Sequence, residues 1–363
     1  MQSDHESKPA GKLRLLIWAL VATVILISIS WGIVVLSGTP PIDTKTTCVD
    51  PENGVQTLTS FSKLVGRPIN CVLLFNDANP GWNQWVSPWF THSSAGDLDW
   101  STWIKADSTN RRVIITQQMV PANVPSNWRI VGAGGGYDRY ARQLAINLVA
   151  AGMGNAVIRL GHEMNGTWYH DSLGDNPSQY RDWAIYWARI VKAMRSVPGS
   201  HFLFDWCIAA GYRDIPFSSY YPGNNVVNII GIDIYDAGMP GDPQNAKARW
   251  HSLDLEPSGL SQILAFAHEN NKPLSIPEWG LVTKKDGGLG DDPTYVEGIA
   301  NTIQDNPVVY ESYFNKAVGG TMPLGDAERS LQVWRKYFGD RGIVAERPWL
   351  DLRGIRFQYT NAN

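Results

Sequence analysis

Residues 155–168 read Asn-Ala-Val-Ile-Arg-Leu-Gly-His-Glu-Met-Asn-Gly-Thr-Trp, a short apolar run that ends in polar and aromatic side chains. The β-branched residues favour a buried strand, and Gly166 lets the chain turn away after it. Because side chains alternate along a strand, we expect Arg159, Gly161 and Glu163 on one face. α/β enzymes place their chemistry at the carboxyl ends of such strands. The stretch therefore predicts an α/β fold with Glu163 at a functional site.

A second short apolar run also ends in a glutamate. Residues 272–280 read Lys-Pro-Leu-Ser-Ile-Pro-Glu-Trp-Gly and place Glu278 at the end of another predicted strand. A single glutamate in such a position is usually just solvated, but hydrolysis of a glycosidic bond requires two carboxylic acids. One protonates the leaving oxygen, and the other attacks the sugar or activates water. Glu163 and Glu278 are therefore the candidate catalytic pair.

The composition is that of an ordinary globular protein. Of the 363 residues, 44% are hydrophobic and 18% are charged, which fits one large domain or two. The formal net charge is -3, without a basic patch. This charge argues against nucleic acid as a partner.

The N-terminal region contains a long apolar segment. Residues 15–37 carry no charged side chain. At about 1.5 Å per residue, they are long enough to cross a hydrocarbon core of about 30 Å. A cleaved signal peptide is the alternative, but its apolar run usually has only about 7–15 residues, and no cleavage motif follows here. The segment therefore predicts an uncleaved transmembrane helix with the lipid bilayer as its partner.

Basic residues before this segment set its predicted orientation. They are Lys8, Lys12 and Arg14. The positive-inside rule then places the N-terminus in the cytoplasm. We expect a cytoplasmic tail at 1–14, a signal anchor at 15–37 and an extracytoplasmic linker at 38–66, with the folded domain outside the cytoplasm.

Three cysteines in an exported chain indicate one disulfide and one spare thiol. Cys48 and Cys71 flank the start of the predicted domain, which favours this pair. Cys207 lies within an apolar run and reads as a small buried hydrophobic residue. The sequence leaves the connectivity open.

From residue 67 the sequence alternates between short apolar runs and helical patterns. The predicted strands are Ile69–Phe75, Arg112–Met119, Trp128–Gly132, Asn155–Glu163, His201–Cys207, Val226–Tyr235, Leu274–Glu278 and Val308–Phe314. Helical patterns occur at Tyr137–Ala151, Tyr180–Met194, Leu260–Glu269, Tyr295–Gln304 and Asp326–Phe338. Eight alternating units predict a (β/α)8 TIM barrel at 67–340, followed by a C-terminal tail at 341–363. The alternative, an open doubly wound sheet, would carry a phosphate-binding loop after its first strand, where this sequence has none.

Two stretches resemble cofactor-binding or metal-binding motifs, but the spacing of their residues does not match those motifs. The glycines at 132–136 lack the third glycine of a dinucleotide loop, because Tyr137 stands in its place. His162-Glu163 begins like a zinc protease motif, but Gly166 replaces its second histidine. We therefore predict neither a cofactor nor a metal.

Aromatic residues gather where predicted strands end. Trp168, Trp206, Tyr235 and Trp279 close or follow such strands, and five more tryptophans lie between residues 82 and 103. For any single tryptophan, packing in the core is the more common role. Aromatic faces also stack on sugar rings, so this concentration indicates a sugar-binding cleft.

With these residues in place, the chain resembles glycoside hydrolase family 26, within clan A of the retaining (β/α)8 glycosidases. The resemblance rests on Arg159–Trp168, Tyr220–Tyr235, Lys272–Gly280, and Gly290–Pro293 with Val308–Phe314. Its most specific part is the string His-Glu-Met-Asn-Gly at 162–166 in its strand context. Together these stretches span most of residues 130–315.

The resemblance implies roles for particular residues. Glu163, at the fourth strand, would be the acid/base, and Glu278, at the seventh, the nucleophile. His162 and Arg159 match sugar-contacting and carboxylate-orienting residues of the family. Tyr235 would hydrogen-bond the nucleophile. The other implied sugar contacts are Trp168, Trp206 and Trp279.

The chain departs from the mannanases of the family in two places. Tyr169-His170-Asp171 stands where they usually continue with further aromatics, and Leu160-Gly161 replaces the usual Pro-Leu. These departures weaken mannan as the substrate without touching the catalytic pair.

The sequence thus predicts a membrane-anchored retaining endo-β-glycanase that hydrolyses β-mannan, or a related β-glucan or β-xylan, by double displacement. Two alternatives stay open: a transglycosylase that remodels a cell-envelope or exported polysaccharide, and a catalytically silent polysaccharide-binding protein. The presence of both Glu163 and Glu278 argues against the silent protein. The sugar, the linkage, endo or exo action and protein partners stay open.

Overall fold

The computed structural model describes residues 46–51, 54–76, 79–92, 99–238 and 242–339. All of them belong to one compact unit, Thr44–Asn363. The predicted cytoplasmic tail, transmembrane segment and C-terminal tail, at 1–14, 15–37 and 341–363, lie outside the described residues. Within the part of the chain that is described, no helix is both long and apolar enough to span a bilayer.

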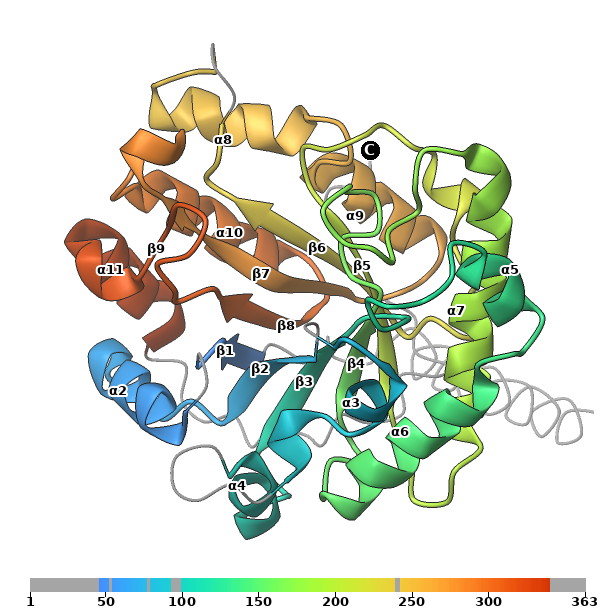
Figure 1. Ribbon diagram of the computed structural model, residues 1–363. Coiled ribbons are helices and arrows are strands. Elements are labelled where there is room, and N and C mark those ends of the chain that lie inside the picture. Colours follow the sequence, from blue (N-terminus) through green and yellow to red (C-terminus); the bar gives the residue numbers. More distant parts are fainter. Residues whose placement is uncertain (1–45, 52–53, 77–78, 93–98, 239–241, 340–363) are drawn as a thin grey trace, which may run out of the picture. The chain divides into compact units, whose positions relative to one another are not determined.

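Eight parallel strands form a closed barrel (Figure 1). They are β1 (Thr46–Val49), β2 (Cys71–Asn76), β3 (Arg112–Gln117), β4 (Val157–Leu160), β5 (Leu203–Ala209), β6 (Ile229–Tyr235), β7 (Leu274–Val282) and β8 (Val308–Tyr313). Each strand pairs with the next along the chain, and β1 also pairs with β8, which closes the ring. The short β9 (Thr321–Met322) pairs antiparallel with β7. The structure therefore has the predicted (β/α)8 barrel fold.

Helices connect the strands and cover the outside of the barrel (Figure 1). They are α2 (Val55–Val65), α3 (Trp82–Val86), α4 (Trp100–Ala106), α5 (Trp128–Ala133), α6 (Asp138–Ala150), α7 (Tyr180–Arg195), α8 (Ala246–Leu255), α9 (Leu260–Glu269), α10 (Pro293–Asp305) and α11 (Glu328–Trp334). In α7, buried side chains recur every three or four positions, at Trp183, Trp187, Ile190 and Met194, so one face of the helix packs inward. This face explains why the helical pattern at 180–194 was readable from the sequence.

The predicted linker at 38–66 is wrong from residue 46 onward. Strand β1 and helix α2 both lie within it, so the folded domain begins before residue 67. β1 has only four residues, too few for a period-2 pattern to stand out. In α2, Leu58, Phe61 and Val65 are buried at helical spacing, and Gly66 ends the helix with a φ of 82°.

The predicted strand at Trp128–Gly132 is also wrong, because these residues belong to helix α5. Its buried residues are Trp128 and Gly132, four positions apart, which is the spacing of one helix face. A Cβ on Gly132 would lie 2.4 Å from Cγ of Tyr186, so glycine is required where α5 meets α7. The sequence analysis missed β1 and added this false strand, so the two errors cancel in the strand count. The fourth to eighth predicted strands therefore correspond to β4 to β8.

Small and apolar side chains fill one part of the barrel interior. They form a cluster of their own that includes Cys48, Cys71, Leu73, Ile114, Val157, Ile229 and Val309. Cys71, Val157 and Ile229 are the first or nearly the first residues of their strands, so this cluster fills the amino-terminal end of the barrel. The opposite end, where the strands finish, is where the polar side chains lie.

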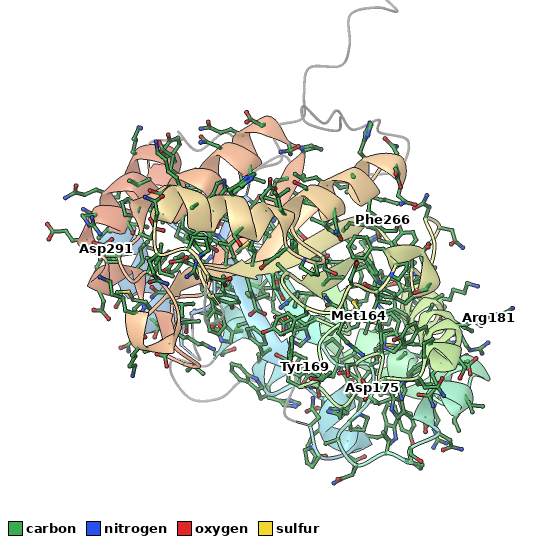
Figure 2. The ribbon with its side chains drawn as sticks, turned by 90° about the horizontal axis from the view of Figure 1, so that it is seen from above. Met164, Tyr169, Asp175, Arg181, Phe266 and Asp291 are labelled. Carbon is green, nitrogen blue, oxygen red and sulfur yellow. A yellow bond between two sulfur atoms is a disulfide. The ribbon has the colours of Figure 1, made fainter. Side chains whose placement is uncertain are left out.

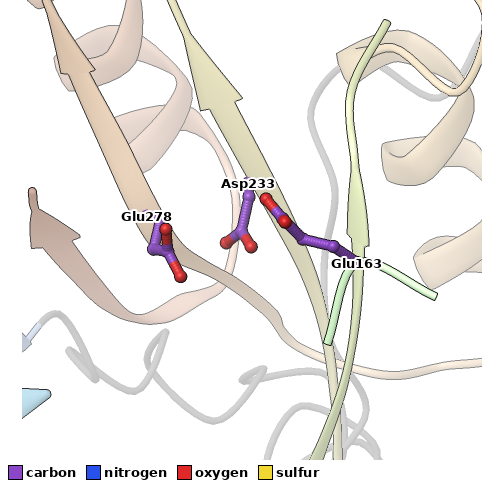
Figure 3. A group of neighbouring side chains, drawn as sticks. All are labelled: Glu163, Asp233 and Glu278. Atoms are coloured by element: carbon purple, nitrogen blue, oxygen red, sulfur yellow. The ribbon is translucent and has the colours of Figure 1, made fainter. Parts of the chain in front are cut away.

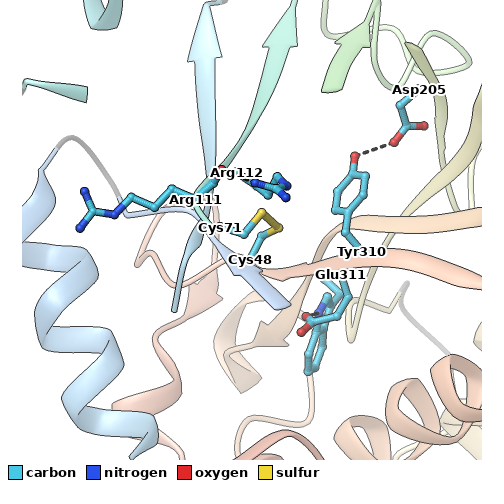
Figure 4. Close-up of a disulfide and its surroundings, with 8 residues drawn as sticks. Cys48, Cys71, Arg111, Arg112, Asp205, Tyr310 and Glu311 are labelled. Carbon is cyan, nitrogen blue, oxygen red and sulfur yellow. Dashed lines mark hydrogen bonds between the residues drawn. A yellow bond between two sulfur atoms is a disulfide. The ribbon is translucent and has the colours of Figure 1, made fainter. Parts of the chain in front are cut away.

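Cys48 on β1 and Cys71 on β2 form the predicted disulfide, and Cys207 is a buried free thiol (Figure 4). β1 and β2 share a single register pair, Val49 with Val72. The disulfide therefore supplies much of the connection between these two strands.

Removing this disulfide with the double substitution Cys48→Ala and Cys71→Ala should lower the free energy of unfolding by about 2–4 kcal/mol. The bond joins residues 23 positions apart, and without it the unfolded chain gains conformational freedom. Urea unfolding of the two proteins measures the difference. If both cysteines of the unreduced wild type react with an alkylating reagent, the bond does not form in solution.

Candidate active site

Three carboxylates meet at the carboxyl ends of the strands (Figure 3). Glu163 follows β4, Asp233 lies on β6 and Glu278 lies on β7. One carboxylate oxygen of each lies within 4.8 Å of one from each of the other two. Around the barrel, β4 and β7 are separated by β5 and β6, and Asp233 lies between the two glutamates. The structure therefore brings together the two glutamates singled out from the sequence.

Glu163 does not lie in a strand, contrary to the predicted alternation of Arg159, Gly161 and Glu163. β4 ends at Leu160, and the chain then turns with left-handed backbone at Gly161 (φ 58°) and Glu163 (φ 51°). This conformation is uncommon for a residue with a side chain and is maintained here by surrounding contacts. One of these contacts is a hydrogen bond of 2.9 Å from the backbone N–H of Glu163 to the carbonyl of Cys207.

Glu278 is almost completely buried, with 7% of its surface exposed. Its Oε1 accepts a hydrogen bond from Arg159, and its Oε2 accepts one from the Tyr235 hydroxyl at 2.7 Å. Burial raises the pKa of Tyr235, and the charge of Glu278 raises it further, so the phenol keeps its proton. Both contacts fix the direction in which the Glu278 carboxylate points.

Arg159 is fully buried and links two of the three carboxylates. Its guanidinium forms ion pairs with Asp233 and Glu278 and also donates to the Thr116 hydroxyl at 3.1 Å. Its predicted place beside the carboxylate of Glu278 is thus observed. Asp233 was missed in the sequence, although it alternates with Tyr235 along β6 and so shares its inward face.

Glu163 lies in surroundings that differ from those of Glu278. Burial raises the pKa of Glu163 to about 7, the charge of Glu278 adds to this rise, and Arg159 opposes it. The indole N–H of Trp168 donates to Oε2 of Glu163 at 2.6 Å and also opposes the rise. Glu163 can therefore hold a proton near neutral pH.

His162 lies beneath this site with 1% of its surface exposed. Its ring lies 4.4 Å from the Tyr169 ring and 6.2 Å from the Phe75 ring, measured between centroids. Burial, together with the charge of Arg159, lowers the pKa of His162 well below its usual value, so the ring is neutral. Among the described residues, neither ring nitrogen has a hydrogen-bond partner.

Two predicted sugar contacts, Trp206 and Trp279, are part of the hydrophobic core. Both are fully buried. On β5 and β7 they alternate with inward-pointing residues and so point outward, toward the helices. Trp206 packs against Phe217 and Phe266, and Trp279 donates to Glu311 at 2.6 Å. Neither side chain can reach a sugar in this structure.

An exposed aromatic pair lies beside Glu163 instead. Trp168 is 42% exposed and Tyr212, in the loop after β5, is 49% exposed. Their ring centroids lie 4.3 Å apart in an edge-on arrangement. Tyr212 was missed in the sequence, because nothing local shows that the loop after β5 folds over the turn after β4.

A second polar group lies deeper in the barrel. Asp205 on β5 accepts a hydrogen bond from Ser275 at 2.6 Å. It accepts a second from Tyr310 at 2.5 Å, which Figure 4 shows. Burial raises the pKa of Asp205 to about 6, although these hydrogen bonds and the charge of Arg159 oppose the rise. This network was not predicted from the sequence.

The three carboxylates could in principle hold a metal ion, since each offers an oxygen ligand. Arg159 already brings a positive charge to Asp233 and Glu278 in ion pairs. A cation bound to both would have to displace the guanidinium or lie beside it. The arrangement suits two reacting carboxylates better than a metal site.

The comparison with family models matches part of the chain. Residues 139–247 match the model described as glycosyl hydrolase family 26. The predicted resemblance to this family is confirmed. The matched stretch contains Glu163, Arg159 and Tyr235 but ends before Glu278. The match supports assigning the chain to the glycoside hydrolases.

Solved structures of mannanases share the fold of this chain. The β-mannanase BoMan26A from Bacteroides ovatus is 13% identical, with 82% of this chain and 90% of that chain covered and a TM-score of 0.57. An endo-β-1,4-mannanase double mutant from Cellulomonas fimi is 17% identical, with 82% and 70% covered and a TM-score of 0.56. The Bacillus subtilis mannanase man26 is 14% identical, with 79% and 82% covered and a TM-score of 0.52. Among curated proteins, none matches this chain.

Proposed function

We propose that this chain is a retaining β-glycanase that cleaves β-mannan, or a related β-glucan or β-xylan, with Glu278 as nucleophile and Glu163 as acid/base. The observation that carries the proposal is the pair of differently held carboxylates at the strand ends. An oxygen of Glu163 lies within 4.8 Å of an oxygen of Glu278. Retaining enzymes hold their carboxyl groups about 5–5.5 Å apart, whereas inverting enzymes need about 6.5–9.5 Å to admit a water.

In the first step, Glu278 attacks the anomeric carbon while Glu163 gives its proton to the leaving oxygen. Arg159 and Tyr235 hold the attacking carboxylate in one orientation. The bond between sugar and leaving group breaks as the bond between the sugar and Glu278 forms. The neutral His162, whose ring nitrogens have no partner among the described residues, is proposed to hydrogen-bond a sugar hydroxyl.

In the second step, Glu163 acts as a base. Once Glu278 is esterified, its negative charge is gone, and with it one of the causes that raise the pKa of Glu163. The pKa of Glu163 therefore falls, and the group is left ionised after protonating the leaving oxygen. It can then take a proton from water as the water attacks the anomeric carbon. The product keeps the starting anomeric configuration.

The proposal is tested by incubating the protein with a panel of β-mannan, mixed-linkage β-glucan, β-1,3-xylan and envelope polysaccharide. Proton NMR of the first product then reports its anomer. We expect cleavage of one of these polymers with retention. An inverted first product would overturn the mechanism, and no cleavage of any polymer would overturn the hydrolase assignment.

Transfer to a sugar acceptor is a second candidate, favoured by the exposed pair Trp168 and Tyr212. This pair lies next to the acid/base, where a leaving or accepting sugar would sit, and aromatic faces bind sugar rings. Chain-length analysis of the products separates the two reactions. Hydrolysis yields only shorter chains, whereas transfer also yields chains longer than the substrate.

The alkaline side of the pH profile should report Glu163. The first step needs Glu163 protonated, and its pKa is raised to about 7, so kcat/KM should fall as the pH rises through about 7. Glu163→Gln cannot ionise, so the residual activity of this variant should not fall there. A wild-type rate that stays constant up to pH 9 would contradict the assigned role.

The proposal places the enzyme on the outer side of a membrane, held by residues 15–37. Full-length protein should then stay with the membrane fraction through an alkaline wash, because an apolar helix is not released by charge changes. A version beginning near Thr39 should be soluble and active. Recovery of mature protein cleaved near residue 38 would show that the segment is a signal peptide.

A further inference from the structure

The turn that carries Glu163 is hydrogen-bonded to the end of β5 and also to one arginine. Residues 161–175, between β4 and α7, carry both Glu163 and Trp168 and have little regular secondary structure. Met164, Tyr169 and Asp175, which lie along this segment, are labelled in Figure 2. Such a loop does not by itself hold a carboxyl group to within about half an ångström.

Arg213, in the loop after β5, contacts this segment at two places, 165–166 and 174. Its Nε donates to the carbonyl of Asn165 at 2.9 Å and its Nη2 to the carbonyl of Gly166 at 3.0 Å. Its Nη1 donates to the carbonyl of Gly174 at 2.8 Å. One planar guanidinium thus holds residues 165–166 and residue 174 together.

Arg213 is itself held in place by its own backbone. Its carbonyl accepts hydrogen bonds from the N–H of Ile215 at 2.9 Å and from the Ser258 hydroxyl at 3.3 Å. The preceding residue, Tyr212, lies against Trp168. The three hydrogen bonds from the Arg213 guanidinium to the carbonyls of Asn165, Gly166 and Gly174, called the clamp below, therefore connect the Glu163 turn to a loop that is anchored elsewhere on the barrel.

We infer that Arg213 is a positioning residue for the acid/base, an inference that rests on the proposed function. Glu163 has a left-handed φ of 51°, which unconstrained chain would leave. The carbonyls that Arg213 binds belong to the second and third residues after Glu163. Releasing them lets the turn relax and moves the carboxyl group away from the leaving oxygen.

Arg213 acts through geometry and not through its charge. The charges that shift the pKa of Glu163 are those of Glu278 and Arg159. A lysine at position 213 keeps the positive charge, but its compact ammonium cannot reach three carbonyls at two ends of a segment. Arg213→Lys should therefore behave like a loss of the clamp.

The test compares two aryl β-mannobiosides in the full-length enzyme. A 2,4-dinitrophenyl group leaves without a proton, whereas a phenyl group needs the acid. For Arg213→Lys and for Arg213→Gln, we expect kcat/KM for the phenyl substrate to fall about 10- to 100-fold. For the dinitrophenyl substrate we expect it to stay within about threefold of wild type. In the pH profile of kcat/KM, the fall on the alkaline side should also move to lower pH. A relaxed turn exposes Glu163 to water, and this exposure lowers its pKa.

Two variants serve as controls. Asp175→Asn removes an exposed ion pair with the same guanidinium but leaves its carbonyl bonds. Arg195→Lys disrupts a comparable clamp before β6, where Arg195 donates to the carbonyls of Asn225 and Val226. In both variants, the ratio of kcat/KM for the phenyl substrate to kcat/KM for the dinitrophenyl substrate should equal that of the wild type.

Several outcomes overturn the inference while leaving the proposed function intact. They are a parallel loss on both substrates, no change in either variant, or a normal Arg213→Lys beside an impaired Arg213→Gln. The last outcome would mean that the positive charge at position 213 is what positions Glu163, and that the planar guanidinium with its several N–H donors is not needed. If the wild type cleaves neither mannobioside nor any polymer of the panel, the proposed function fails and the inference fails with it.

Discussion

Replacing Glu278 with Ala is expected to abolish turnover, lowering kcat by at least about 10⁴-fold. The variant lacks the carboxylate that attacks the anomeric carbon, and neighbouring groups cannot replace it. Asp233, the nearest other carboxylate, is engaged by Arg159. The effect should be equally large for substrates with good and poor leaving groups, because both need a nucleophile.

The matched control is Asp205→Asn, which removes the charge of another buried carboxylate of the barrel. Asp205 accepts hydrogen bonds from Ser275 and Tyr310 and does not contact Glu278. The kcat of the Asp205→Asn variant should stay within about tenfold of wild type. Melting temperatures of both variants check that the fold is intact. Near-native activity of Glu278→Ala would refute the nucleophile assignment.

Replacing Glu163 with Ala is expected to lower kcat/KM on a polysaccharide by about 10²- to 10⁴-fold, the usual contribution of a general acid. On a 2,4-dinitrophenyl glycoside the first step should survive, since that leaving group needs no proton. The intermediate then accumulates, because no base activates water for the second step. Azide should restore turnover, as it attacks the intermediate without base help and yields a glycosyl azide of retained configuration.

The control for this prediction uses the residue that contacts Glu163. Trp168→Phe removes the 2.6 Å hydrogen bond to the carboxyl group but leaves an acid in place. Its turnover should not respond to azide. If azide does not accelerate Glu163→Ala, or accelerates the wild type to the same extent, Glu163 is not the acid/base.

The strands of the barrel show which local patterns can be read from a sequence. Seven of the eight predicted strands overlap observed ones, because their apolar runs are long enough to stand out from the loops. β1 was missed because it has only four residues and is held by its pairing with β8 and by the disulfide. The stretch at Trp128–Gly132 was misread because a short apolar run has no visible period until its packing partner, α7, is known.

The substrate-binding residues show the limit of reading chemistry from residue types. Trp206 and Trp279 have the composition of a sugar cleft, but strand alternation points both toward the helices. Trp168 and Tyr212 are exposed because they follow strand ends in loops. A tryptophan next to a catalytic residue in sequence is therefore on the opposite face of the sheet when both lie within a strand.

The sequence by itself determined the alternation of strands and helices, the two glutamates and the residues that resemble family 26, since each of these depends on a few neighbouring residues. Only the tertiary structure decided that Asp233 pairs with Arg159, that Asp205 is buried under the site, and that Arg213 clamps the Glu163 turn. These contacts join residues about 45 to 75 positions apart. Such contacts form only when the barrel closes, because their partners lie on different strands and loops that the fold alone brings together.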